Sequence, residues 1–143
     1  MHDARINRII DANINRAKEG LRVCEEITRF ILENHNLTVK LKGLRHKITG
    51  LAKNLIPTEK LLQERDSAKD TGKTIRANEL KRSGLGDIFF ANIQRVKESV
   101  RVIEEFSKLT DTKTALYFKE IRYETYKLEK TIAEKITGLR NHR

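Results

Sequence analysis

The feature that most constrains the fold is an internal repeat. Residues 12–26 read ANINRAKEGLRVCEE and residues 91–105 read ANIQRVKESVRVIEE, so ten of fifteen positions are identical at an offset of 79 residues. The match continues along the chain, because TVKLKGLRHK at 38–47 aligns with ALYFKEIRYE at 115–124. A repeat of this length predicts one helical hairpin that occurs twice. It favours an all-α fold, a four-helix bundle of two repeated hairpins with pseudo-two-fold symmetry.

Residues that break helices are rare, since the chain has one proline, Pro57, and few glycines outside 43–50 and 72–86. We therefore expect long helices over 4–33, 38–56, 87–109 and 113–139, with Asp3 before the first, Asp87 capping the third, and turns at ENHN and TDTK. Shorter helices are expected near 58–65 and 76–82. The chain is interpreted as a single domain, 1–143, with repeats at 8–56 and 87–135 and a polar connector at 57–86.

Composition indicates a soluble, basic protein. The 143 residues carry a formal charge of +10, which attracts polyanions, phosphorylated metabolites or acidic lipid surfaces. The single cysteine, Cys24, excludes an intramolecular disulfide and fits a reducing compartment. The start, MHDARINRII, lacks the apolar run of a signal peptide, and the apolar stretch at 88–93 is too short to span a bilayer. We expect a cytoplasmic protein without a membrane segment.

Helical periodicity places polar residues within the expected apolar faces. On the first helix Asn13 and Arg16 share a face with Ile9, Ala17, Gly20, Val23, Cys24, Ile27 and Ile31. On the third, Asn92 and Arg95 share one with Ile88, Val96, Val102, Ile103 and Phe106. The second helix has Arg45 in a stripe of Leu41, Leu44, Ile48, Leu51, Ala52 and Leu55, and the fourth has Arg122 among Phe118, Ile121, Leu128 and Ile132. Each half is thus expected to point one asparagine and two arginines inward.

Four inward arginines require negative charge beside them, because an unpaired buried guanidinium costs on the order of several kcal/mol. Part of that charge is expected from glutamates at the edge of the apolar arcs: Glu19, Glu26, Glu98 and Glu105. In one interpretation these form buried bridges that set the helix register. In the other, a cavity remains in the bundle and a phosphorylated small molecule completes the neutralisation, because arginine's planar fork suits phosphate oxygens.

Other repeated cations are assigned to the polar face. Arg22 and Arg101, with Lys18 and Lys97, are interpreted as a solvated surface in which Arg22 pairs with Glu26, and an oligomer contact is the alternative. The polar segment RDSAKDTGKT at 65–74 is not a Walker motif, since it lacks the first glycine and a preceding strand. It is either an ordinary solvated linker or a segment that closes over a site.

Histidines and the cysteine give no sign of metal or covalent chemistry. The four histidines, His2, His35, His46 and His142, show no helical pairing, which argues against a transition-metal site. Cys24 is interpreted as a small core residue. The aromatic residues are expected to pack in the core, although a few could stack against a heterocyclic ring: Phe89, Phe90, Tyr117, Tyr123 and Tyr126.

Four stretches occur in order across nearly the whole chain: RIIDANINRAKEGLRVCEEITRF, RDSAKDTG, ANIQRVKESVRVIEEFSKL and IRYETYKLE. Together they resemble the small hydroxymethylpyrimidine-phosphate kinases of bacterial thiamine biosynthesis, found alone or fused in front of thiamine-phosphate synthase. The resemblance implies transfer of the γ-phosphoryl group of ATP to the monophosphate of 4-amino-5-hydroxymethyl-2-methylpyrimidine, which yields the diphosphate. We expect a stand-alone kinase, with ATP and Mg²⁺ as cofactors and thiamine-phosphate synthase acting downstream.

On this hypothesis the phosphate groups are clamped by four arginines: Arg16, Arg45, Arg95 and Arg122. Of these, Arg45 and Arg122 bind substrate together with the orienting amides of Asn13 and Asn92, whereas Arg16 and Arg95 act catalytically with Glu19 and Glu98. Magnesium is assigned to Glu19, Glu98, Asp66 and Asp70, and the nucleotide to Asp66, Asp70 and Lys73. The acceptor is a phosphate that is largely ionised at neutral pH, so the reaction requires no strong general base.

Three other functions compete with this one. A basic helical module that binds nucleic acid explains the charge, although arginines that face inward do not suit a duplex. A helical enzyme of the chorismate-mutase type also places arginines inside a bundle, and only the architecture supports it. A structural interaction protein is the third. The expected partners are a phosphorylated pyrimidine and a nucleotide, and a homo-oligomer is left open.

Overall fold

The computed structural model describes residues 3–56 and 84–141. These form four long α-helices, α1 (Ala4–Glu26), α2 (His35–Ala52), α4 (Leu85–Ser107) and α5 (Thr112–Asn141), and a π-helical turn, η1 (Ile27–Ile31), that continues α1. No strand occurs in these ranges, so the all-α prediction is confirmed. The helices expected near 58–65 and 76–82 lie outside the described residues. Over the described ranges, no helix has both the length and the apolar character that a membrane span requires.

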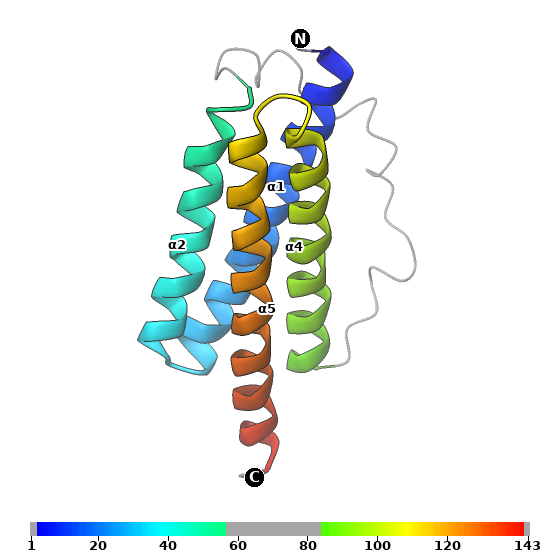
Figure 1. Ribbon diagram of the computed structural model, residues 1–143. Coiled ribbons are helices and arrows are strands. Elements are labelled where there is room, and N and C mark those ends of the chain that lie inside the picture. The colour runs from blue at the N-terminus through cyan, green and yellow to red at the C-terminus, as the bar shows by residue number, and fades with distance from the viewer. Residues whose placement is uncertain (1–2, 57–83, 142–143) are drawn as a thin grey trace.

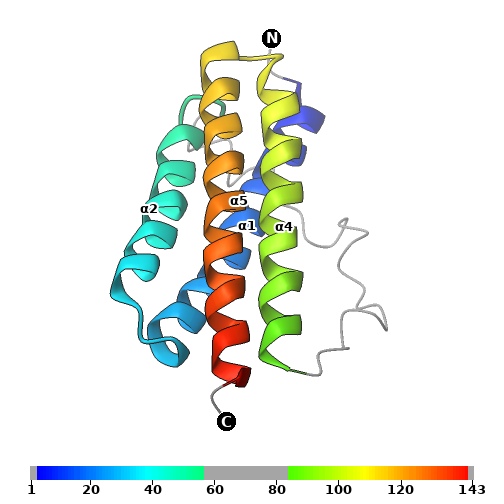
Figure 2. The same ribbon diagram turned by 60° about the horizontal axis from the view of Figure 1, so that its bottom comes forward.

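The helices pack as two antiparallel hairpins, α1 with α2 and α4 with α5 (Figure 1). The hairpins meet mainly along α1 and α4, whereas α2 and α5 contact each other to a smaller extent. A turned view shows α4 and α5 side by side along their length (Figure 2). The predicted four-helix bundle is therefore confirmed, and the two-fold relation between its hairpins stays a prediction.

Side-chain caps define the helix ends of the first hairpin. The Oδ1 atom of Asp3 accepts a hydrogen bond from the backbone N–H of Arg5 (2.8 Å), which begins α1. After η1, Glu33 adopts a left-handed φ of 50°, and Asn34 caps α2 by accepting from the backbone N–H of Leu37 (2.9 Å). The predicted turn at ENHN is confirmed, although α2 begins at His35 and ends at Ala52, rather than spanning 38–56.

The second hairpin begins at Gly84, which caps α4 without a side-chain hydrogen bond. The prediction that Asp87 caps this helix is wrong, because Asp87 lies within its first turn. A carboxylate there still interacts favourably with the helix dipole. Asp111 begins α5 by accepting from the backbone N–H of Lys113 (3.1 Å) and from the hydroxyl of Thr114 (2.7 Å).

One apolar core runs through the four helices, and its position on α1 and α4 differs from the prediction. The expected stripes on α2 and α5 are buried, except for the half-buried Leu51. On α1 the buried line is Ile10, Ile14, Ala17, Leu21 and Cys24, and on α4 it is Phe89, Ile93, Val96, Val100 and Ile103. The predicted faces are rotated from these lines by about a quarter of a turn.

α1 and α4 approach closely at Gly20. A Cβ atom at this position would lie 2.8 Å from Cγ2 of Val96 and 2.9 Å from the backbone oxygen of Asn92. A side-chain methyl can rotate away, but a helical carbonyl is held by its own hydrogen bond. Glycine therefore lets the two hairpins pack backbone against backbone.

We expect Gly20→Ala to lower the free energy of unfolding by about 1–3 kcal/mol, because overpacking outweighs the better helix propensity of alanine. Gly43→Ala is the matched control, because Gly43 lies inside α2 and a Cβ atom added there would have nothing within 4 Å. That variant should be stabilised by about 0.5–1 kcal/mol. Urea unfolding followed by circular dichroism measures both, and equal shifts would contradict the close approach at Gly20.

Candidate functional site

Two repeated arginines, Arg45 on α2 and Arg122 on α5, lie mostly buried between the helices of their hairpins. Their side chains are 17% and 12% exposed. Arg45 donates from Nε to Oε2 (2.7 Å) and from Nη2 to Oε1 (3.0 Å) of Glu25 on α1. Arg122 donates from Nε to Oε1 of Glu104 on α4 (2.9 Å). Both glutamates are buried, so the interpretation of buried Arg–Glu bridges is correct for these two arginines.

The glutamates predicted to neutralise the arginines are instead all exposed: Glu19, Glu26, Glu98 and Glu105. The buried glutamates are Glu25 and Glu104, which precede Glu26 and Glu105 in the sequence. They face the interior because they lie one residue closer to the buried line of their helices. Glu26 lies 3.8 Å from Arg22, which confirms the predicted surface pair.

The prediction that Arg16 and Arg95 point inward is wrong, because both are exposed. The buried line of α1 is centred near Ala17 and Leu21. At 3.6 residues per turn Arg16 lies about 120° from that centre, and Arg95 has the same position on α4. The predicted clamp of four inward arginines therefore reduces to Arg45 and Arg122.

Asn13 and Asn92 make the same local hydrogen bond. Each donates from Nδ2 to the carbonyl oxygen four residues earlier, Ile9 for Asn13 and Ile88 for Asn92, both at 2.8 Å. Asn13 is buried and Asn92 is half-buried. Their amide nitrogens serve their own helices, and an orienting role toward a ligand stays a prediction.

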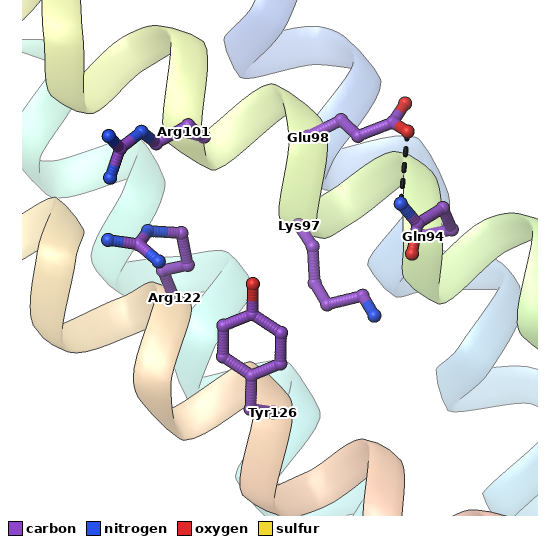
Figure 3. A pocket seen from close by; sticks show the side chains of 6 residues that line it. All are labelled: Gln94, Lys97, Glu98, Arg101, Arg122 and Tyr126. Atoms are coloured by element: carbon purple, nitrogen blue, oxygen red, sulfur yellow. Dashed lines mark hydrogen bonds between the residues drawn. The ribbon is translucent and has the colours of Figure 1, made fainter.

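A groove of about 370 Å³ lies between α4 and α5. Its lining residues are Gln94, Lys97, Glu98 and Arg101 of α4 and Arg122 and Tyr126 of α5. Figure 3 shows the Tyr126 hydroxyl between the side chains of Arg122 and Lys97. Glu98 accepts a hydrogen bond from Gln94 (3.0 Å) and points away from these three side chains. The groove thus presents three cations beside one aromatic ring.

Lys97 crosses the groove to α5, where its Nζ donates to both carboxylate oxygens of Glu129 (2.9 and 3.0 Å). The same Nζ lies 5.1 Å from the centre of the Tyr126 ring, within the range of a cation–π contact. The interpretation of Lys97 as a solvated surface residue is therefore wrong. Its counterpart Lys18 forms no ion pair within the described residues.

Glu104 is shared by two arginines at the groove. Arg122 donates a hydrogen bond from Nε to Oε1 of Glu104, and Nη1 of Arg101 lies 3.6 Å from Oε2 of the same carboxylate. The hydrogen bond with Glu104 raises the pKa of Arg122 against the lowering effect of burial, and the Tyr126 hydroxyl adds to the rise. Arg122 therefore stays charged, and among the described residues no carboxylate accepts a hydrogen bond from either of its Nη atoms.

The predicted nucleotide and metal ligands Asp66, Asp70 and Lys73 lie outside the described residues. Over residues 3–56 and 84–141, no group of three or more His, Cys, Asp or Glu side chains is placed to hold a metal ion. Of the two predicted metal ligands that are described, Glu98 borders the groove and Glu19 does not.

Cys24 is buried in the core, as predicted. Burial raises the pKa of its thiol to about 12, and the negative charges of Glu25 and Glu129 add to the rise. The thiol is therefore protonated at neutral pH and is not a nucleophile.

The sequence interpretation missed Glu129, which holds Lys97 in the groove. In the alignment of the repeats Glu129 corresponds to Ala52, and Tyr126 corresponds to Thr49. The signal that could have found Glu129 was this departure from the repeat, whereas Tyr126 is already among the aromatic residues that the sequence offers for stacking against a ring.

Comparison with known proteins places the chain in a family. Residues 8–131 match the model of the ThiD2 family. The chain is 41% identical over 128 residues to a thiamine-phosphate synthase of Prochlorococcus marinus subsp. pastoris, 40% over 129 to one of Thermosynechococcus vestitus, and 37% over 133 to one of Rhodopirellula baltica. These alignments cover 89%, 90% and 92% of this chain but 35% of each relative. The chain thus spans about a third of the length of these relatives. No solved structure matches.

We expect Arg45→Met to lower the free energy of unfolding by about 3 kcal/mol, because it leaves the buried Glu25 without its partner. Arg22→Met is the control, since Arg22 is 60% exposed and its pair with Glu26 is long. The control should change stability by less than about 0.5 kcal/mol. Chemical unfolding measures both, and a loss below 1 kcal/mol in Arg45→Met would contradict a structural role for the bridge.

Cys24 should react with a disulfide reagent at pH 8 only when the protein unfolds. Burial raises the pKa of the Cys24 thiol to about 12, so little thiolate is present at pH 8, and burial blocks access as well. Release of the chromophore from Ellman's reagent, with and without urea, measures how fast the thiol reacts in the unfolded and in the native protein. Rapid reaction of the native protein would show that this part of the core is open.

Proposed function

We propose, on the premise that this chain belongs to the ThiD2 family, that it is an ATP-dependent kinase of thiamine biosynthesis. Its acceptor is 4-amino-5-hydroxymethyl-2-methylpyrimidine phosphate and its product is the corresponding diphosphate. The relatives named thiamine-phosphate synthase support the pathway, since each shares a segment that spans most of this chain. That segment covers about a third of each relative, which favours a separate step over the synthase reaction itself.

The observation that carries the proposal is the cationic groove between α4 and α5. Its volume of about 370 Å³ suits a phosphorylated six-membered ring, and its lining combines phosphate-binding cations with Tyr126. Arg122 is hydrogen-bonded to Glu104, and Arg101 lies within ion-pair distance of the same carboxylate, so both guanidinium groups lie at the groove before any ligand arrives. Such preorganisation lowers the cost of ordering side chains on binding.

The reaction suits this set of residues. An oxygen of the acceptor monophosphate forms a bond to the γ-phosphorus of ATP, the bond from that phosphorus to the bridging oxygen breaks, and ADP leaves. The transition state requires little covalent chemistry from the protein and spreads negative charge over the phosphoryl oxygens. Catalysis therefore depends on positioning the two substrates and on cations near these oxygens. Arg101 and Arg122, with Lys97 beside them, supply the cations in place of Arg16 and Arg95, which do not line the groove.

Magnesium, when bound with the nucleotide, would neutralise charge on the β- and γ-phosphates. Glu98 fits a supporting role among the described residues, because it is an exposed carboxylate at the rim of the groove and no ion pair occupies it there. A hard cation such as Mg²⁺ prefers carboxylate oxygens. Asp66 and Asp70 complete the proposed ligand set.

Nucleic-acid binding is the competing function. The exposed Arg16 and Arg95 lie on the surface of a chain with a net charge of +10, where they can meet the phosphates of a duplex. A generic duplex therefore belongs among the ligands of the test.

We expect the purified protein to release ADP from Mg-ATP when the pyrimidine monophosphate is present, and to form the diphosphate detectable by phosphorus NMR. A coupled assay measures ADP release, with reactions lacking the acceptor as the blank. Thermal stabilisation by the pyrimidine monophosphate but not by the duplex separates the two functions. ADP release that is no faster with the acceptor than without it would overturn the kinase proposal.

A further inference from the structure

We propose that the two hairpins have different tasks: the groove of the second binds a phosphomonoester of an aromatic ring, while the equivalent residues of the first only stabilise the fold. The proposal rests on the proposed function for the identity of the natural ligand. It also names the half of the repeat that holds that ligand.

The sequence alone would place equal sites in both hairpins. The six residues that line the groove align with Asn15, Lys18, Glu19, Arg22, Arg45 and Thr49. Four of the six pairs are identical, and Gln94 differs from Asn15 only by one methylene. The contacts that these residues make are therefore what separates the two halves.

The first difference is how the buried arginine is neutralised. Arg45 makes two hydrogen bonds with Glu25, one to each carboxylate oxygen, so the two side chains neutralise each other in a bidentate pair. Arg122 makes one hydrogen bond with Glu104, and the second oxygen of Glu104 faces Arg101. The Nη atoms of Arg122 therefore donate to no carboxylate among the described residues, and these N–H donors remain available beside the groove.

The exposed arginines of the two hairpins differ in their position relative to the groove. Arg22 in the first hairpin lies against the exposed Glu26 at 3.8 Å. Arg101 in the second lies between Glu104 and Glu105, at 3.6 and 3.3 Å, and lines the groove. Arg101 is still 54% exposed, so an incoming phosphate can reach it without unfolding the helix.

The third difference lies on α5, where Glu129 and Tyr126 replace Ala52 and Thr49. Glu129 holds the ammonium of Lys97 over the Tyr126 ring, 5.1 Å from its centre. Tyr126 remains 43% exposed, which leaves ring surface for a ligand. The second hairpin thus joins an aromatic surface to the guanidinium groups of Arg101 and Arg122, with Lys97 held beside them by Glu129. This combination favours a phosphate attached to a planar ring.

The repeat supplies matched controls for a binding experiment on the full chain. Arg101→Met and Arg22→Met remove equivalent, exposed arginines, so both variants should fold, and circular dichroism checks this. Binding of the pyrimidine monophosphate, measured by isothermal titration calorimetry, should weaken about 10- to 100-fold in Arg101→Met and less than about twofold in Arg22→Met. Equal weakening in the two variants, or none in either, would overturn the proposal.

A second pair of measurements tests the ring. Phenyl phosphate and inorganic phosphate serve as probes that need no turnover. Tyr126→Thr, which installs the residue of the equivalent position, should weaken binding of phenyl phosphate while leaving binding of inorganic phosphate within about twofold. Equal losses for both probes would contradict a ring-binding role for Tyr126, and failure of the wild-type protein to bind any of the three phosphates would overturn the site itself.

The outcomes separate this proposal from the kinase proposal. If the pyrimidine monophosphate binds in an Arg101-dependent way but ADP release shows no dependence on it, the kinase proposal fails and the division of tasks stands. If the protein turns over but Arg22→Met and Arg101→Met lose activity equally, the kinase proposal stands and the division of tasks fails.

Discussion

The buried carboxylates Glu25 and Glu104 are the constraint on which most of this structure depends. A carboxylate in an apolar interface is strongly unfavourable unless a cation pairs with it, so each glutamate requires an arginine from the opposite helix of its hairpin. Arg45 and Arg122 meet that requirement from α2 and α5. The pairing fixes the rotation of each helix about its axis, since a slip of one residue would separate the partners. The groove beside Arg122 exists at its present place for this reason.

The sequence predicted the four long helices of the described residues and their order, and it placed most of their ends to within a few residues, because the repeat and the scarcity of proline and glycine are strong signals. It also predicted the apolar stripes of α2 and α5, where large apolar residues recur at regular spacing and the other faces are charged. On α1 and α4 the prediction failed by about a quarter of a turn. Ile9 and Val23 flank the true face of α1, so apolar residues there cover more than the buried arc and do not define its centre.

The rotation of the predicted apolar faces on α1 and α4 explains which site residues the sequence predicted correctly. The prediction that Arg45 and Arg122 face inward is correct because the buried faces of α2 and α5 were predicted correctly. The same prediction for Arg16 and Arg95 is wrong because the buried faces of α1 and α4 were misplaced. The carboxylate partners were missed by a single position for the same reason. Glu129 and the role of Lys97 could not follow from the periodicity of either helix alone, because their contact depends on how α4 and α5 are aligned lengthwise.

The absence of a side chain at Gly20 has a mechanical consequence for the helices that the structure describes. A motion that brings the hairpins closer would press the backbone of α1 against that of α4, because no side chain separates them here and the space of a Cβ at Gly20 is only 2.9 Å from the Asn92 carbonyl oxygen. The hairpins therefore have little room to move closer at this point, whereas long exposed side chains such as Arg101 can change rotamer within picoseconds to nanoseconds.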